Sequence, residues 1–294
     1  MNRFIIMCAG YALAVSGLMS CTNDDVQQCH DAKHIPMTFS VSHPAQTRAT
    51  ATEFESGDCI GLYVAKADVS LEIGGNLVNN EPLTCKGDSW QTKKTLYWDD
   101  GIYNAYAYYP YIGEVSSIED LPFSVSTDQS SERTSTSLGG YEASDLLYAT
   151  TKNITASDSP ISLSFKHIMS KLKICLVKGE DFEGDMPAKA DVYVHSTVPA
   201  ATVDLQAGVV TRYVKGTQHT IKAHQDDDNT YSAIIVPQRI DNRQPLVEVV
   251  MNGMSYMFES KFVFKPGVEH LVRLIINDNP GNIKININGE TDKW

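Results

Sequence analysis

Histidine and cysteine side chains are the first candidates for chemistry, because they ligate metals and act as nucleophiles. His219 and His224 lie five residues apart, beside the acidic run Asp226-Asp227-Asp228. On a strand, residues five apart point to opposite faces, and an Asp-rich run between apolar segments is typical of a solvated turn. The sequence contains no CxxC and no HExxH motif. We therefore expect no metal site and no cofactor.

Neighbouring carboxylates suggest a second kind of chemistry, general acid/base hydrolysis. Such pairs stand at Asp99-Asp100 and Glu119-Asp120, but any acidic protein has pairs of this kind, and hydrolysis depends on their geometry. The sequence has no Gly-x-Ser-x-Gly elbow and no Gly-rich phosphate loop. It therefore predicts no catalytic residue, and we expect that the protein is not an enzyme.

Cys21 stands where a lipid could be attached. Arg3 is followed by an uncharged apolar run, Phe4 to Leu18, and the chain turns polar directly after Leu18-Met19-Ser20-Cys21. A positive start and a short apolar run are typical of a secretory signal, and the last four residues resemble the lipobox of bacterial lipoproteins. Each buried acyl CH₂ contributes about 0.8 kcal/mol, so several acyl chains on Cys21 anchor a protein stably. Residues 1–20 are thus expected to be a lipoprotein signal peptide. The alternative is a plain signal peptide beside an incidental cysteine.

Four more cysteines follow Cys21, and an exported compartment permits disulfides. Four cysteines allow three complete pairings, and sequence does not choose between them. The four are Cys29, Cys59, Cys85 and Cys175.

Composition excludes several classes of protein. The 294 residues include 24 Lys and Arg against 36 Asp and Glu, a formal net charge of −12 with no basic run. Nucleic-acid phosphates repel such a surface, so nucleic acid is not an expected partner. With 42% hydrophobic residues the chain can bury a core and is not a disordered tail. After residue 20, no stretch approaches the ~18 apolar residues of a membrane-spanning helix.

Hydrophobic alternation with a period of two recurs along the chain and predicts strands. Ile35, Met37, Phe39 and Val41 alternate with polar residues or proline, and Asn252-Gly253 between two later apolar runs predicts a two-residue hairpin turn. Residues 143–148 are the one candidate for a short helix. Further expected strands lie at residues 60–64, 103–111, 161–165, 172–176, 192–194, 231–236, 246–251, 256–258, 262–264, 271–276 and 283–287.

Many short strands separated by Gly, Asn, Asp and Pro favour an all-β fold of antiparallel sandwiches. The polar stretch 156–160 is the best candidate boundary. We therefore expect two tandem β-sandwich domains, residues 49–165 and 166–294, preceded by a leader, residues 21–48.

Several motifs in order resemble one family. After the lipobox come Gln46-Thr47-Arg48-Ala49-Thr50, then the run from Phe54 to Tyr63, the run from Tyr106 to Tyr111, and Leu163 to Leu172. This order is similar to that of the fimbrillin-like lipoproteins, precursors of pilus subunits in Gram-negative gut and oral anaerobes. The similarity covers most of residues 18–180 and is looser beyond them.

The resemblance implies transthyretin-like sandwiches, export to the outer membrane through lipid on Cys21, and cleavage between Arg48 and Ala49 by a trypsin-like surface protease. It also implies assembly with other pilus subunits by strand exchange, and thus a role as a fimbrial subunit or pilus-associated adhesin at the cell surface. Whether the subunit forms the stalk, the tip or the anchor stays open.

The residues themselves are compatible with strand exchange. Burying Ile35, Met37, Phe39 and Val41 contributes about 6–12 kcal/mol gross, an upper estimate because unfolded chains are already compact. Cleavage after Arg48 would cut the covalent link to this strand and leave an apolar groove with an unpaired edge, a template for a strand of another chain. Three residues form a candidate donor strand, because they alternate with polar ones in the same way: Ile283, Ile285 and Ile287. The alternative is that residues 35–41 and 283–287 are ordinary first and last core strands.

A surface lipoprotein that binds glycans is the competing function. Trp90, Trp98 and the tyrosines of residues 103–111 could stack on sugar rings if they shared an exposed face. Tyrosines in an alternating strand more often fill a core, so this reading requires coplanar, exposed rings.

Overall fold

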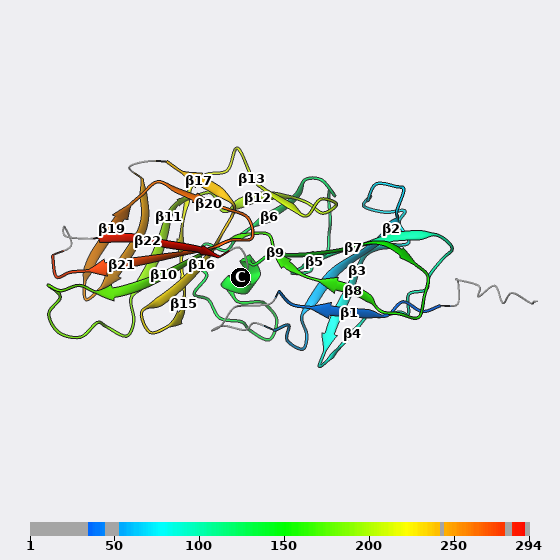
Figure 1. Cartoon of the computed structure of the whole chain (residues 1–294), viewed down its shortest axis with the longest axis horizontal. Helices are drawn as coiled ribbons and strands as arrows, with labels where there is room; N and C mark the ends of the chain where they lie inside the picture. Colours follow the sequence, from blue (N-terminus) through cyan, green and yellow to red (C-terminus); the bar gives the residue numbers. More distant parts are fainter. Residues whose placement is uncertain (1–34, 45–52, 242–243, 280–283, 292–294) are drawn as a thin grey trace, which may run out of the picture. The chain divides into compact units, whose positions relative to one another are not determined.

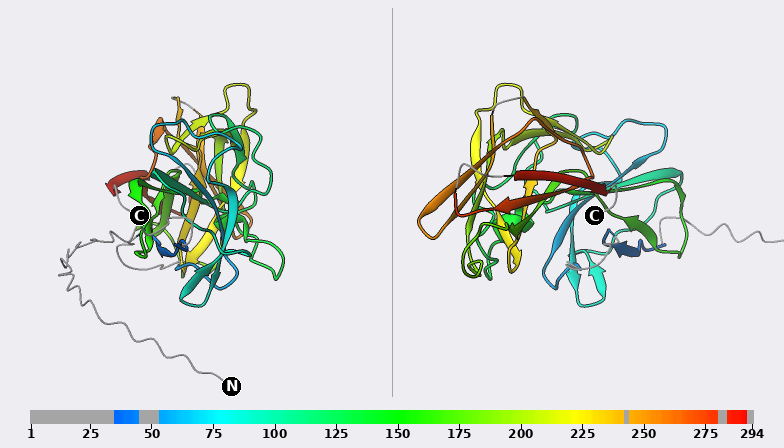
Figure 2. Two further views of the ribbon diagram at one scale, coloured as in Figure 1. Left: turned by 90° about the vertical axis from the view of Figure 1, so that its right-hand side faces the viewer. Right: turned by 60° about the vertical axis from the view of Figure 1, so that its left-hand side comes forward.

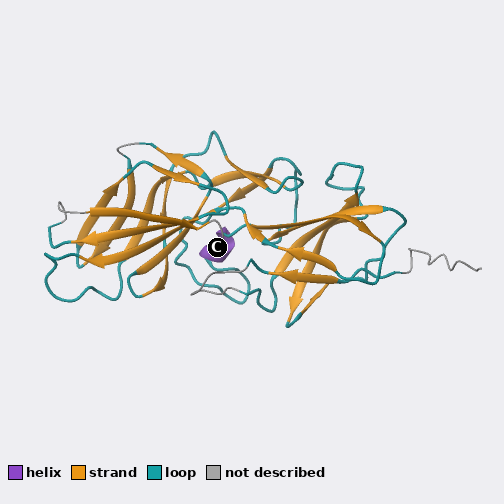
Figure 3. Cartoon of the chain, in the orientation of Figure 1, coloured by secondary structure: helices purple, strands orange, loops and turns teal. Residues whose placement is uncertain are grey.

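Strands make up nearly all the regular structure. The computed structural model describes residues 35–44, 53–241, 244–279 and 284–291 (Figure 1). Within these ranges the one helix is α1 (Gly140–Ser144), and strands and loops form the rest (Figure 3). No helix there is long and apolar enough to cross a membrane. The predicted all-β fold class is confirmed.

A six-stranded antiparallel sheet organises the first half of the chain, in the order β4-β3-β2-β5-β7-β9. Its central strand β5 is buried on both faces: Ala105 and Tyr109 face one apolar core, whereas Tyr106 and Tyr108 face another. Gly61 lies opposite Tyr108, whose ring occupies the space that a Cβ would need. The strands are β2 (Cys59–Lys66), β3 (Val78–Lys86), β4 (Ser89–Gln91), β5 (Ile102–Tyr109), β7 (Leu147–Thr155) and β9 (Lys166–His167).

A much smaller layer covers one face of this sheet. It consists of β1 (Phe39–Ser42) and β8 (Ile161–Ser164), which pair in parallel. In Figure 1 the two strands run side by side, β1 in blue and β8 in green. Because only these two strands form the second sheet among the described residues, β1 supplies a large share of the cover over this core.

A three-stranded sheet, β13-β12-β6, joins the two halves of the sequence. The strand β6 (Leu121–Ser124) pairs with β12 (Ala200–Asp204), and β12 pairs with β13 (Val209–Arg212). Farther along, the fully buried Gln129 side chain donates to the Ile234 carbonyl (2.8 Å) and accepts from the Ile234 amide (2.7 Å). The Ser/Thr-rich stretch after β6 is thus part of the packed fold of the second half.

Two larger sheets form the second half (Figure 2). A five-stranded sheet has the order β15-β16-β10-β21-β22, and a four-stranded sheet the order β14-β11-β18-β19. The pairing of β10 with β21 is parallel, as is that of β1 with β8, a departure from purely antiparallel sheets. The remaining strands are β10 (Ser170–Lys178), β11 (Asp191–Thr197), β14 (His219–Lys222), β15 (His224–Asp227), β16 (Thr230–Ile235), β17 (Gln238–Ile240), β18 (Pro245–Met251), β19 (Met254–Glu259), β20 (Phe262–Phe264), β21 (Glu269–Ile276) and β22 (Lys284–Thr291).

Local predictions were right for the hairpin and wrong for the helix. Asn252 (φ 51°) and Gly253 (φ 76°) form the two-residue turn between β18 and β19, the left-handed pair that a type I′ turn requires. The helix was predicted at residues 143–148 but lies three residues earlier, because Leu147 and Tyr148 pair with Tyr109 and Tyr108 in the sheet.

Candidate functional site

Residues 35–43 pack between two separate parts of the chain, the loop at residues 96–98 and the strand β8, and the place that they fill is called the groove below. At the start of the segment, the Met37 amide donates to the Leu96 carbonyl (2.8 Å) and the Trp98 amide to the Ile35 carbonyl (3.0 Å). The loop at residues 96–98 and the strand β8 thus hold successive parts of the segment through backbone hydrogen bonds.

The second part of the segment pairs with β8 as a parallel strand. Phe39 to Ser42 pair with Ile161 to Ser164 in unbroken register. Beyond each end of this ladder, the Ile161 amide donates to the Thr38 carbonyl (2.8 Å) and the Phe165 amide to the Ser42 carbonyl (3.0 Å).

The segment presents one apolar face to the core. The Met37 side chain is 6% exposed, and Ile35, Phe39 and Val41 are half-buried against the same cluster, while the alternate residues face solvent. This cluster includes Leu62, Leu83, Tyr103 and Ala149 of the six-stranded sheet, together with Trp98 of the loop at residues 96–98. Whether this strand can leave stays a proposal.

An aromatic cluster marks the two ends of the segment that contains the predicted cleavage point. Arg48 and Ala49 lie outside the described residues, and His43 and Phe54 flank them on either side. The rings of His43 and Phe54 are in edge-on contact, with centroids 4.9 Å apart. Phe54 also makes edge-on contacts with three rings of the sandwich, at 5.1–5.5 Å: Trp90, Tyr109 and Phe165.

A charged cluster holds the chain directly after Phe54. Arg133 lies 2.6 Å from the carboxylate of the buried Asp58, 3.3 Å from Glu55 and 3.5 Å from Glu142 of α1. Asp58 also accepts a hydrogen bond from the Glu55 amide (2.8 Å). Burial, and next the charge of Asp58, raise the pKa of the Tyr109 hydroxyl, so this phenol stays a neutral donor toward the carboxylate (3.4 Å).

A pair of histidines adjoins this cluster. His167 Nδ1 lies 2.8 Å from the Asp145 carboxylate, and both side chains are largely buried. The His43 ring lies 5.9 Å from the ring of His167. Burial is the main cause that lowers the pKa of His43, and the nearby His167 lowers it further. The end of the groove segment therefore favours a neutral imidazole.

The candidate donor strand lies at a sheet edge. Within the part of the chain that the structure describes, β22 pairs only with β21, with Ile285 opposite Leu274 and Ile287 opposite Val272. Ile285 packs half-buried on the core, whereas Ile283 lies outside the described residues. Its role as a donor stays a prediction.

The predicted lipidation residue Cys21 also lies outside the described residues, as does Cys29. The three described cysteines, Cys59, Cys85 and Cys175, are free. Cys59 and Cys85 stand on neighbouring strands but out of register, since Cys59 pairs with Thr84.

The structure contradicts the aromatic platform proposed for glycans. Trp98 and Tyr103 are each 1% exposed, and the other tyrosines of β5 are buried. Trp90 is half-buried and packs on Phe54. These rings fill the cores on both sides of the sheet, because β5 lies in its centre.

The other candidate sites do not assemble into a reaction centre. The side chains of Asp99, Asp100, Glu119 and Asp120 are exposed. His219 and His224 lie on strands of two different sheets, and no group of metal-ligating side chains occurs within the described ranges.

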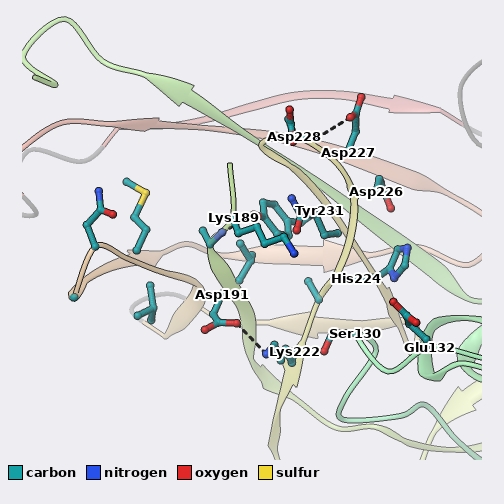
Figure 4. Close-up of a pocket in the computed structure, with 18 residues that line it drawn as sticks. Ser130, Glu132, Lys189, Asp191, Lys222, His224, Asp226, Asp227, Asp228 and Tyr231 are labelled. Atoms are coloured by element: carbon teal, nitrogen blue, oxygen red, sulfur yellow. Dashed lines mark hydrogen bonds and ion pairs between the residues drawn. The ribbon is translucent and has the colours of Figure 1, made fainter. Parts of the chain in front are cut away.

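A cavity of about 770 Å³ lies in the second half (Figure 4). Its walls carry the Asp191–Lys222 ion pair (2.9 Å), Lys189, Tyr231 and the acidic run at residues 226–228. The Tyr231 hydroxyl accepts a hydrogen bond from the Ala190 amide (2.8 Å). The lining of this polar pocket includes His224 and the acidic run but not His219, and within the described ranges no group of metal-ligating side chains occurs.

Solved structures define the class of protein first. The fold matches a candidate cell adhesion protein of Bacteroides ovatus with a TM-score of 0.67 and 18% identity, over 88% of this chain and 97% of that one. A second candidate cell adhesion protein, from Bacteroides uniformis, matches with a TM-score of 0.63 and 20% identity, over 86% and 97% of the two chains. The chain thus has the all-β fold of these Bacteroides proteins.

The family follows from the sequence comparison. Residues 47–294 match the profile of the fimbrillin-like family, and the chain belongs to this family. Over 187 residues it is 30% identical to a candidate fimbrium tip subunit of Bacteroides ovatus, Fim1C, covering 56% of this chain. The chain spans only about a third (33%) of that relative's length. The predicted class, a fimbrial subunit or adhesin, is confirmed at the level of the family, which implies a location at the cell surface in a fimbrium.

Sequence analysis missed Phe54 and Arg133 as organisers of the site. Arg133 contacts Asp58 across 75 residues of sequence, and no local pattern marks such a pair. For Phe54, the available signal was its position directly before the turn at Glu55-Ser56-Gly57-Asp58.

Proposed function

We propose that the chain is the precursor of a pilus subunit or pilus-associated adhesin whose first strand is replaced during assembly. It is exported as a lipoprotein through Cys21 and reaches the outer membrane. A trypsin-like surface protease then cuts between Arg48 and Ala49. Residues 35–43 leave their groove, and a strand of another pilus subunit takes their place.

The observation that carries this proposal is how residues 35–43 are held. They cover an apolar core as half of a two-stranded layer, yet their only covalent link to the following sandwich passes through Arg48. An unpaired β8 edge beside exposed apolar side chains would be a template for strand addition.

The rest of the site supports a sandwich that survives the loss of the segment. Phe54 and the cluster of Arg133, Asp58 and Glu142 lie after the cleavage point and contact one another or the sheet. The new N-terminal arm therefore stays attached at Phe54 and Glu55 when the segment has gone. We extend the proposal to two sandwich domains, residues 49–165 and 166–294, linked through β6.

The experiment is to determine the mature N-terminus of surface-assembled protein, with an Arg48→Ala variant beside it. We expect Ala49 as the first residue of assembled wild-type protein, and loss of assembly for the variant. Arg212→Ala removes an exposed arginine of β13 and serves as the control, with normal assembly. Assembly of Arg48→Ala at the wild-type level would refute the cleavage step.

A further inference from the structure

The groove is shaped around apolar side chains at four alternating positions. Ile35, Met37, Phe39 and Val41 all face the core, and Met37 is buried. Because alternate residues of a strand share a face, any replacement strand must supply four apolar side chains in the same i, i+2, i+4, i+6 pattern to fill the groove.

The groove also requires a regular strand. Phe39 to Ser42 match β8 one to one, and nearer the start of the segment an isolated antiparallel bridge joins Pro36 to Tyr97 of the loop at residues 96–98. A bulge in the incoming strand would turn the side chains beyond it to the wrong face.

The chain's own C-terminal strand lacks this pattern. Ile283, Ile285 and Ile287 supply three apolar positions, but in a regular strand without a bulge the next alternate positions are Gly289 and Thr291. The preceding positions are Gly281 and Asn279. In either direction and in any register, at least one of the four groove positions therefore receives Gly, Asn or Thr.

The pairing of β22 shows a second mismatch. Val272 pairs with Ile287 and His270 with Glu290, so Asn288 and Gly289 together oppose the single residue Leu271. Gly289 has a φ of 90°, in the left-handed region that suits a glycine at a bulge. The regular part of β22 ends where the fourth apolar side chain would be needed.

We propose that the groove accepts a strand from a different pilus subunit, with apolar side chains at four alternating positions, and not the C-terminal strand of a second copy of this chain. The inference rests on the proposed strand exchange and specifies the partner. An unfilled position loses the burial of a whole side chain and leaves a cavity in the core, so the copy's strand binds more weakly.

The test uses the full chain cut after Arg48, verified by mass spectrometry, and labelled synthetic peptides whose dissociation constants are measured by fluorescence anisotropy. One peptide is the groove segment, residues 34–44, and another is the C-terminal strand, residues 282–291. Two variants of the second peptide carry Gly289→Val or Asn288→Val. In the regular strand that the groove requires, Gly289→Val adds a fourth apolar residue to the alternation of Ile283, Ile285 and Ile287, whereas Asn288→Val adds the same side chain outside that alternation.

We expect Gly289→Val to bind at least tenfold more tightly than the unchanged C-terminal peptide, and Asn288→Val to bind within about twofold of it. The cut chain alone should stay monomeric by sedimentation. Equal binding of the unchanged and Gly289→Val peptides, an equal gain from Asn288→Val, or chains of copies formed by the cut protein would overturn the inference. A different outcome would contradict the strand exchange itself. In that outcome no peptide binds, not even the groove segment, and the residues before Ala49 stay attached after the cut.

Discussion

The ring of Phe54 stands edge-on against the ring of His43, with centroids 4.9 Å apart. One of these residues belongs to the segment that we expect to leave, and the other to the sandwich that stays. We therefore expect the two parts to separate at this contact.

Replacing Phe54 by alanine tests whether this ring holds the arm after the cleavage point. The ring touches Trp90, Tyr109 and Phe165 as well as His43. Because it is half-buried, we expect a loss of about 2–3 kcal/mol in the free energy of unfolding, at or below the low end for Phe→Ala in cores. Urea unfolding followed by tryptophan fluorescence measures it. Tyr213→Ala, at an exposed ring (46%), should change stability by less than about 0.5 kcal/mol, and equal losses would contradict the role of Phe54.

Replacing Arg133 by methionine tests the charged cluster. Asp58, 4% exposed, would keep a backbone amide and a phenol as donors but lose its cation. We expect a loss of about 1–3 kcal/mol, below the range for fully buried pairs because the Arg133 side chain is partly exposed.

The matched control is Arg239→Met, whose pair with Asp241 is exposed (59% and 78%). Its effect should stay below about 0.5 kcal/mol. Chemical denaturation compares the two variants, and a similar small effect at both arginines would show that the Arg133 cluster adds little.

We expect His43 to make the stability of the folded chain, with the groove segment in place, decrease in acid. Burial and the neighbouring His167 lower the pKa of its ring, whereas a backbone hydrogen bond and the carboxylates of Asp145 and Asp58 raise it. The adjoining pocket is lined by further charged and phenolic groups: Glu53, Glu55, Arg133, Tyr109, Tyr141 and Glu142. The pKa of His43 is lowered below 6.5 in the folded chain. The unfolded chain then binds more protons, so stability is full above pH 6.5 and falls as the pH drops through 6.5 toward the folded pKa.

A His43→Gln variant should lose less stability than the wild type between pH 7.5 and pH 5.5, as measured by denaturant midpoints at each pH. His219→Gln removes an exposed ring and should keep the wild-type pH dependence. A wild-type slope in His43→Gln would mean that other groups cause the acid sensitivity.

Replacing Gln129 by alanine tests how much its contact with Ile234 of the second half contributes to the free energy of unfolding. Its side chain satisfies both the amide and the carbonyl of Ile234. Alanine there leaves two buried backbone groups without a partner, and we expect a loss of about 2–4 kcal/mol in thermal or chemical unfolding. Gln91→Ala, at an exposed residue, should stay within about 0.5 kcal/mol of the wild type. A Gln129→Ala variant with wild-type stability would show that the backbone amide and carbonyl of Ile234 find other partners.

The sequence predicted what a local pattern can encode. The alternation of Ile35 to Val41 anticipates which side chains face the core, and Asn252-Gly253 anticipates its hairpin. Both depend on neighbours within a few residues.

Features that depend on the sheet as a whole were not predictable. The tyrosines of β5 suggested a sugar platform because alternation predicts one exposed face, whereas the central position of β5 buries both. Several strands between β11 and β16 were missed, since His219 to Asp227 is polar and is ordered by pairing with β11 and β16. Arg133 finds Asp58 only once the fold has formed.

The most direct test of the account is exchange of the groove strand. A labelled peptide of residues 34–44 is incubated with the chain before and after the cut at Arg48, and its incorporation is followed by native mass spectrometry. We expect the cut chain to take up the labelled peptide and release its own leader, while the uncut chain takes up none. A cut chain that keeps its leader against excess peptide would contradict the claim that this strand is replaceable.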